Sequence, residues 1–322
     1  MAHRDVVVVG ASAGGVEALR ALVRGLPADL PAAVLIVLHI PRGTPSALPV
    51  ILTRAGPLTA TAAVDGERIL PGHIYVAPTD HHLLLLGDRV RLSHGPAENG
   101  HRPAVCPLFR SVARSAGRRA IGVILSGARA DGADGAYDLA RRGGLVVTQD
   151  PADALFPSMP EAVADRLTPD HVVPAAEMGA LLAELTTVPL PEGPDVAVDP
   201  RLDDEVAISA LSARTTDETA GAVPAGFGCP DCGGSLFQLS DEPIPHYRCR
   251  IGHAWSPENL IDEQAVATEG ALWTALRALE EKSALSRRMA KRLNADNYQR
   301  SADDADNAIT LIRQLLDRLA KQ

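Results

Sequence analysis

Aromatic residues and cysteines are scarce in this sequence. Phe, Trp and Tyr together make up 3% of the 322 residues, so a folded core must rest on Val, Leu, Ile and Ala. Of the four cysteines, Cys106 stands alone, and Cys229, Cys232 and Cys249 lie close together. So few cysteines, with three of them clustered, favour a metal site in a reducing compartment over a disulfide scaffold.

The chain also lacks a basic charge excess and a long apolar run. It carries 31 Lys and Arg against 40 Asp and Glu, a net charge of −9, whereas binding to nucleic-acid phosphates needs a basic surface. It has no apolar run of about 18 residues, as a membrane span requires, and no recognisable N-terminal signal sequence. We therefore expect a cytoplasmic protein of about two domains, with neither nucleic-acid binding nor membrane insertion.

Short apolar runs alternate with helical stretches from residue 6 to about residue 185. This pattern predicts a doubly wound, mostly parallel sheet with helices on both faces. The predicted strands are 6–9, 33–38, 73–77, 121–125 and 145–148, and a hairpin joins 82–86 to 89–92 at Gly87-Asp88. Ligands of such sheets bind beyond the carboxyl ends of the strands. The polar residues at those ends are Ser12, His39, Asp80, Ser126, Asp131 and Asp150.

The first predicted strand runs into a glycine-rich turn that contains a serine. Residues 10–14 fit the pattern G-x-S-x-G, in which a serine on a sharp strand-to-helix turn exposes its hydroxyl. The N–H groups of Ala13 and Gly14, at the start of a helix, are placed to stabilise an oxyanion. A phosphate-binding turn also follows a strand and opens a helix, so from this stretch alone both hypotheses stay open.

A serine hydroxyl becomes a good nucleophile when a histidine takes its proton and a carboxylate orients that histidine. His39 follows a predicted strand and precedes Pro41, which places it on a loop at the same sheet edge as Ser12. Asp131, in a glycine-bounded loop, and Asp150, directly after a strand, are both candidates for the carboxylate. Six other histidines lack such a position and are expected at the surface or in the hairpin: His73, His81, His82, His94, His101 and His171.

Five motifs in order carry a family resemblance: G-A-S-A-G-G (10–15), V-L-H-I-P (37–41), H-R-P-A-V (101–105), L-S-G-A-R-A-D-G-A-D-G (125–135) and Q-D-P-x-x-A-x-F-P-S-M-P (149–160). The region 5–185 resembles the catalytic domain of CheB-type chemotaxis protein-glutamate methylesterases. The resemblance implies a Ser-His-Asp hydrolase that removes methyl groups from glutamate side chains, and glutamine deamidation by the same chemistry. It implies Ser12 as nucleophile, His39 as base and Asp131, rather than Asp150, as orienting acid.

The same resemblance implies further residues and partners. Ala13, Gly14, Arg102 and Ala128 would form the oxyanion and substrate contacts. The family usually has Met where this chain has Ala128, Thr where it has Ala13, and an acidic or amide residue where it has Cys106. The implied partners are the cytoplasmic domains of methylated chemoreceptors, together with other chemotaxis signalling proteins.

Typical family members begin with a receiver domain, whereas here the catalytic strand begins at residue 6. We therefore expect no switching by phosphorylation in cis. The altered neighbours of the three site residues leave an alternative hypothesis open, a non-catalytic signalling adaptor that keeps the methylesterase fold.

The rest of the chain changes character twice. Residues 186–226 are rich in Pro, Asp, Thr and Ala, which predicts a flexible linker with room for a short helix near 204–211. The alternative is an ordered extension packed on the first domain. Residues 257–322 show two amphipathic stretches, about 260–293 and 303–320, which predict a helical hairpin or an element that docks on another chain.

Between them lies a small module, 227–256, with the spacing of a zinc knuckle. Cys229 and Cys232 form C-x₂-C, and Cys249 and His253 form C-x₃-H, so the two turns together supply four N and S ligands. His246 is the rival fourth ligand. No ligand position is left open, so we expect structural Zn²⁺, acting independently of Ser12 behind the linker, and no cofactor for catalysis.

Overall fold

The structure is a computed structural model of the whole chain. It describes residues 3–41, 43, 46–190, 193, 196–212, 222–240 and 244–320. The chain divides into two compact units, residues 1–259 and residues 260–322, and each is described by itself.

A seven-stranded sheet forms the centre of the first unit, in the order β3-β4-β2-β1-β7-β8-β9. Every neighbouring pair in it is parallel. The strands are β1 (Val6–Ala11), β2 (Ala33–Leu38), β3 (Thr59–Ala62), β4 (His73–Val76), β7 (Ala120–Ile124), β8 (Leu145–Gln149) and β9 (His171–Val173). The two strands that were not predicted, β3 and β9, are the two edges of the sheet.

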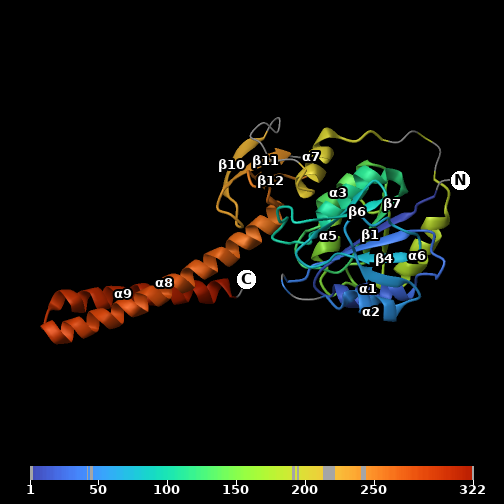
Figure 1. Cartoon of the computed structure of the whole chain (residues 1–322). Helices are drawn as coiled ribbons and strands as arrows, with labels where there is room; N and C mark the ends of the chain where they lie inside the picture. The colour runs from blue at the N-terminus through green and yellow to red at the C-terminus, as the bar shows by residue number, and fades with distance from the viewer. Residues whose placement is uncertain are drawn as a thin grey trace. The chain divides into compact units, whose positions relative to one another are not determined.

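Helices cover both faces of this sheet (Figure 1). One face packs against α1 (Gly15–Arg24), α2 (Leu48–Ala55) and α6 (Ala175–Thr187), and the other against α3 (Val105–Ser115), α4 (Ala133–Arg141) and α5 (Ser158–Ala164). The valine run of β1 alternates between the two cores: Val6 and Val8 belong to one, and Val7 and Val9 to the other. The prediction of a doubly wound parallel sheet is confirmed.

The predicted hairpin is present as β5 (His82–Leu86) and β6 (Arg89–Ser93), with a positive φ of 66° at Gly87 in its turn. A short 3-10 helix (Gly117–Arg119) leads into β7. His82 is fully buried, with Nε2 2.9 Å from the carbonyl oxygen of Pro96. His82 therefore lies in the hairpin, as expected, and its side chain belongs to the interior.

Ten residues of the segment expected to be a linker form helix α7 (Pro200–Ser209). Asp199 caps it by accepting a hydrogen bond from the N–H of Arg201. Leu202 and Val206 join the core on the α3 side of the sheet, and Glu205 is 2% exposed. These ten residues are therefore an ordered extension of the first domain, while the predicted domain boundaries stay a prediction.

A second, antiparallel sheet follows, in the order β10-β11-β12-β13. Its strands are β10 (Val223–Gly228), β11 (Ser235–Ser240), β12 (His246–Cys249) and β13 (Ala254–Trp255). We call this sheet and its turns the ribbon. The turn between β10 and β11 carries Cys229 and Cys232, and the turn between β12 and β13 lies between Cys249 and His253.

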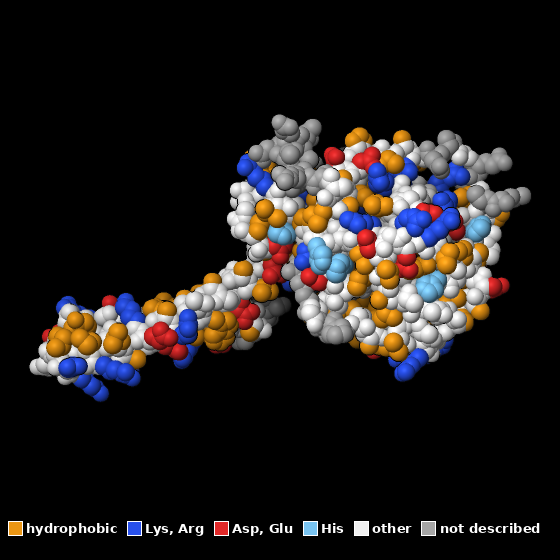
Figure 2. Space-filling model, viewed as in Figure 1, with side chains coloured by type: hydrophobic (Ala, Val, Ile, Leu, Met, Phe, Trp, Pro, Cys, Tyr) orange, Lys and Arg blue, Asp and Glu red, His pale blue; other side chains and the backbone are white. Residues whose placement is uncertain are grey.

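The last two helices are α8 (Pro257–Leu293) and α9 (Asp296–Leu319), which confirm the predicted helical hairpin. Within the second unit, Ser283 Oγ lies 2.7 Å from Asp306 Oδ1, and Arg313 Nη2 lies 2.7 Å from Glu280 Oε1. Apolar side chains remain exposed along the hairpin, as Figure 2 shows in orange. The exposed residues with large apolar side chains are Ile261, Val266, Trp273, Leu285, Leu293, Leu311 and Leu315. Over the part of the chain that the structure describes, no helix combines the length and apolar composition needed to cross a membrane.

Candidate active site

Ser12 lies on the turn between β1 and α1. The N–H of Ser12 donates to the carbonyl oxygen of Ser126, at 3.0 Å, so the loop after β7 holds the turn in place. Gly14 has a φ of 71°, and a Cβ there would lie 2.7 Å from Ser126 Oγ. Glycine is therefore required both by the backbone conformation and by the lack of space. The result is a tight turn that presents the serine at the carboxyl end of β1.

His39 connects Ser12 to Asp131. It follows β2, and its N–H donates to the carbonyl oxygen of Ala11, at 3.1 Å. Its Nδ1 lies 3.1 Å from Ser12 Oγ, and its Nε2 lies 2.8 Å from Asp131 Oδ2. A carboxylate only accepts hydrogen bonds, so in the neutral ring Nε2 carries the proton and Nδ1 is free to accept one from Ser12.

Asp131 is buried, with 1% of its side chain exposed, and is surrounded by donors. The N–H of Val105, in the first turn of α3, donates to Oδ2 at 2.6 Å, and Asn99 Nδ2 donates to Oδ1 at 3.2 Å. Burial alone would raise the pKa of Asp131, but the hydrogen bonds and charge of His39 and the Val105 N–H together bring it well below its usual range. The carboxyl is therefore ionised under all ordinary conditions.

A second histidine, His101, packs against His39. The ring of His101 stacks on His39, with centroids 3.7 Å apart and planes at 13°. Burial, and then the nearby His39, lower the pKa of His101 to about 4, so it is neutral at neutral pH. Sequence reasoning placed His101 at the surface or in the hairpin, and this was wrong. The one available signal was its place in the motif H-R-P-A-V.

The other predicted site residues lie around this centre. Ala128 is exposed, and the loop that carries it lies close to Ser12. A Cβ added to the neighbouring Gly127 would be only 2.9 Å from Ser12 Cβ. Arg102 follows His101, and its Nε and Nη2 lie 3.0 and 2.8 Å from Asp80 Oδ1. Asp150 accepts a hydrogen bond from the N–H of Ala152 at 2.9 Å, in the loop after β8. The structure thus brings Asp131, not Asp150, to His39.

The four expected metal ligands also lie together. The ligand atoms of Cys229, Cys232, Cys249 and His253 are all within 4.8 Å of one another. Cys232 Sγ is 3.7 Å from Cys249 Sγ, and His253 Nδ1 is 3.8 and 3.6 Å from the sulfurs of Cys229 and Cys249. Ligands of a tetrahedral zinc with bonds of about 2.3 and 2.0 Å are separated by roughly 3.5–3.8 Å. The cluster could therefore hold zinc.

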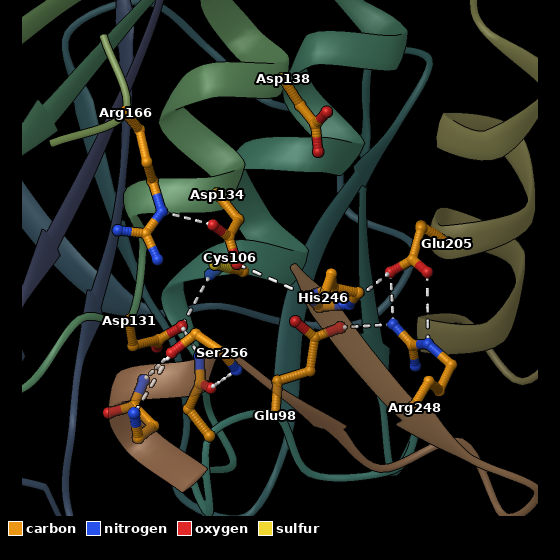
Figure 3. A network of polar contacts seen from close by, with 12 residues as sticks. Glu98, Cys106, Asp131, Asp134, Asp138, Arg166, Glu205, His246, Arg248 and Ser256 are labelled. Atoms are coloured by element: carbon orange, nitrogen blue, oxygen red, sulfur yellow. Dashed lines mark hydrogen bonds and ion pairs between the residues drawn. The ribbon is translucent and has the colours of Figure 1, made fainter. Parts of the chain in front are cut away.

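The rival ligand His246 and the fourth cysteine, Cys106, both lie outside this cluster. The ring nitrogens of His246 lie 3.6 Å from Asp134 Oδ2 and 3.8 Å from Glu205 Oε2, so the rival ligand joins an ion network (Figure 3). Cys106 is buried in α3, and its Sγ accepts a hydrogen bond from the N–H of Gly132 at 3.2 Å. Burial, and then the charge of Asp131, raise the pKa of the Cys106 thiol, so it stays protonated.

A serine on a strand-to-helix turn, an imidazole within hydrogen-bonding distance and a buried carboxylate behind it form the arrangement of a serine hydrolase on an α/β sheet. Residues 7–182 match the family model described as CheB methylesterase. The chain belongs to the CheB methylesterase family.

Relatives and a solved structure agree with this assignment. The chain is 44% identical over 169 residues to a protein-glutamate methylesterase/protein-glutamine glutaminase of Yersinia pestis, an alignment covering 51% of this chain and 48% of the relative. It is 39% identical over 183 residues to one of Methanosarcina mazei, covering 54% and 50%. The Thermotoga maritima CheB methylesterase catalytic domain matches with a TM-score of 0.55 and 33% identity, over 57% of this chain and 100% of that one. The chain spans about half the length of the curated relatives it matches.

Proposed function

We propose that this protein hydrolyses the methyl esters of glutamate side chains in proteins, with Ser12, His39 and Asp131 as its catalytic triad. The observation that carries the proposal is the continuous chain of contacts from Ser12 Oγ through His39 to Asp131, at 3.1 and 2.8 Å. The relatives, named protein-glutamate methylesterase/protein-glutamine glutaminase, support the substrate class.

The proposed reaction passes through an acyl-enzyme. Ser12 Oγ attacks the ester carbonyl carbon while its proton moves to His39 Nδ1, and the negative charge goes to the carbonyl oxygen. The N–H groups of Ala13 and Gly14 are the proposed donors to that oxygen. The intermediate then expels methoxide, which takes the proton from His39 and leaves as methanol. A water molecule, deprotonated by His39, attacks the acyl-enzyme and releases glutamate and free Ser12. With glutamine as substrate, the leaving group is ammonia.

The proposed substrates are the methylated cytoplasmic domains of chemoreceptors, and the proposed site of action is therefore the cytoplasm. Leu155 is exposed and lies beside the serine turn. Its Cβ is 2.9 Å from the position that a Cβ on Gly14 would take. An apolar side chain in this position suits contact with the surface of a protein substrate. Arg102 and Ala128 are the proposed substrate contacts on the other loops of this edge.

The test is release of methanol from a methylated receptor fragment by the wild-type protein and by Ser12→Ala. Methanol production by the wild type alone is the expected result. Equal release by both would remove Ser12 from the mechanism. No release by a folded wild type would favour a signalling adaptor without catalysis.

We also propose that Cys229, Cys232, Cys249 and His253 bind one structural zinc ion. The support is the sulfur–sulfur separation of 3.7 Å and the sulfur–nitrogen separations of 3.8 and 3.6 Å, which suit a tetrahedral ion. The ion would fix the two turns of the ribbon and leave no coordination position for a substrate.

Metal analysis of gently purified protein is expected to find about one zinc per chain, with sulfur neighbours at about 2.3 Å by X-ray absorption. Cys232→Ser, which removes one ligand, should reduce the zinc content. Cys106→Ser is the matched control, because Cys106 lies in α3 and not in the cluster, and it should keep the full zinc content. Less than a tenth of a zinc per wild-type chain would contradict the site.

A further inference from the structure

A tight turn, residues 98–101, connects the candidate active site with the ribbon. Glu98 and His101 pair through both backbone bonds, at 3.2 and 2.8 Å. The two residues between them, Asn99 and Gly100, have φ of 52° and 75°. Positive φ at both central positions is the conformation that Asn-Gly turns adopt readily. The turn is therefore compact, and its side chains reach different partners.

Asn99 makes the first of two connections between the ribbon and this turn, and it also contacts Asp131. Its Nδ2 donates to Asp131 Oδ1 at 3.2 Å, and its Oδ1 accepts a hydrogen bond from the N–H of Ser256 at 2.9 Å. Its own N–H donates to the carbonyl oxygen of Ala254 in β13, at 2.8 Å. Asn99 is 3% exposed and Ser256 is 1% exposed, so water does not replace these bonds. One amide thus joins the orienting acid of the triad to the strand that follows His253.

Arg248 makes the second connection (Figure 3). It precedes Cys249 on β12, and its Nη1 donates to the carbonyl oxygen of Gly252, at 2.5 Å, inside the turn from Cys249 to His253. Its Nη2 donates to Glu98 Oε1, at 3.2 Å, and to Glu205. Arg248 and Glu98 are both 2% exposed in their side chains. A buried charge without a partner is strongly destabilising. Moving the turn away from the ribbon would separate Arg248 from Glu98, so this pair stabilises their relative position.

We propose that zinc in the Cys229–Cys232–Cys249–His253 cluster positions the catalytic acid. The ion fixes the turn from Cys249 to His253, that turn fixes Ala254 and Ser256, and these hold Asn99 against Asp131. Asn99 is a positioning residue, because it contacts Asp131 and not the substrate. The inference rests on the proposed function, since it makes the metal content of the ribbon set the rate of the Ser12 reaction. It replaces the expectation that the ribbon acts independently of Ser12, since hydrogen bonds through Asn99, Asp131 and His39 connect the two.

The first experiment compares the full chain with zinc and after chelation, using the rate at which a fluorophosphonate probe labels Ser12. Ser12 Oγ bonds to the phosphorus of this probe and displaces fluoride, while the serine proton passes to His39, so labelling reports activation of Ser12 without a natural substrate. Chelation is expected to slow labelling about tenfold, equal to about 1.4 kcal/mol in the barrier. It should lower kcat for the methyl ester by a similar factor, with KM unchanged, and added zinc should restore both.

Hydrogen exchange gives a readout that does not depend on catalysis. The N–H groups of Val105 and Cys106 donate to Asp131. Both should exchange faster after chelation, because Asp131 loses its fixed position, while the buried amides of β1 should keep their protection. Faster exchange throughout β1 would overturn the proposal, because zinc would then stabilise the whole domain.

Two substitutions test the route through Asn99. Asn99→Gly removes the side chain and keeps a residue suited to positive φ. Asn99→Asp keeps an acceptor for the Ser256 N–H but replaces the donor to Asp131 with a second carboxylate. Both variants should retain one zinc per chain, and the probe should label their Ser12 at least tenfold more slowly than in the wild type. Chelation should then reduce the labelling rate of each variant by less than a further factor of two. Asn297→Asp, the same chemical change at an exposed position of α9, should behave as the wild type does.

Chelated wild type that labels at the zinc-loaded rate would overturn the proposal. So would Asn99→Gly that labels as fast as the wild type, or that stays as sensitive to chelation. If Ser12 is labelled in a zinc-dependent way but no methanol is released from methylated receptor, the coupling stands and the proposed substrate fails.

Discussion

Ser12→Ala and His39→Ala are each expected to reduce kcat for methyl ester hydrolysis by roughly 10⁴–10⁶-fold. In Ser12→Ala no oxygen remains to form the acyl-enzyme. In His39→Ala the hydroxyl of Ser12 has no acceptor for its proton, since Nδ1 of His39 is the nitrogen 3.1 Å away. Methanol release under single-turnover and steady-state conditions measures both losses.

The double variant should be no slower than either single one, because the two groups act in the same step. His171→Ala, a histidine on the edge strand β9, is the control and should keep its rate within about twofold. If the two losses multiplied in the double variant, Ser12 and His39 would be acting in separate steps. A rate for Ser12→Ala within tenfold of the wild type would require another nucleophile.

The fold could be predicted because its central strands are buried on both faces. Runs such as 6–9 and 33–38 are continuous Val, Leu, Ile and Ala, and the structure buries every residue of β1 and β2. The edge strands lack this signal. β3 reads Thr-Ala-Thr-Ala with two exposed residues, and Val172 of β9 is 50% exposed. Half-exposed strands of three or four residues carry too few apolar positions to stand out from a loop.

Ser12 and His39 could be predicted as neighbours because both follow parallel strands, β1 and β2, that pair directly in the sheet. The choice of Asp131 over Asp150 came from the family resemblance and not from spacing. Asn99 and His101 were missed because they lie on a tight turn without periodicity. Asn99 contacts Asp131 and Ser256, which are 32 and 157 residues away in the sequence. No local pattern reports such contacts.

The sequence predicted a short helix near 204–211, but it favoured a flexible linker over the packed segment that contains α7. Its segment carries several acidic residues, which is typical of an exposed linker. The structure buries Glu205 with two cations beside it: Arg110 Nη1 lies 3.0 Å from Glu205 Oε2, and Arg248 Nη2 contacts the same oxygen. Burial on its own would raise the pKa of Glu205, but these two guanidinium groups hold it well below its usual range. The cations that pair with Glu205 come from α3 and from the ribbon, far away in the sequence. The sequence therefore does not distinguish this buried glutamate from an exposed one.

Asp131→Asn is expected to lower kcat about 10⁴-fold while leaving the fold and zinc content intact. Asp131 Oδ2 accepts both from the N–H of Val105, at 2.6 Å, and from His39 Nε2, at 2.8 Å. Asparagine has no negative charge to stabilise the imidazolium that forms when His39 takes the proton of Ser12. If its NH₂ group occupies the Oδ2 position, it donates to His39 Nε2 and reverses the tautomer, so that Nδ1 cannot accept that proton. KM should change little, because Asp131 is buried behind His39.

Asp150→Asn is the matched control, because it makes the same chemical change at the other carboxylate that the sequence placed at this edge. Asp150 accepts the N–H of Ala152, and an amide oxygen can accept it equally well. Its kcat should therefore stay within about twofold of the wild type. Fluorophosphonate labelling of Ser12 should follow the same order, slow in Asp131→Asn and normal in Asp150→Asn. A large loss in Asp150→Asn with normal rates in Asp131→Asn would transfer the orienting role to Asp150. The short contact of Asp131 with His39 would then be structural, because only the carboxylate that stabilises the imidazolium affects the rate in this way.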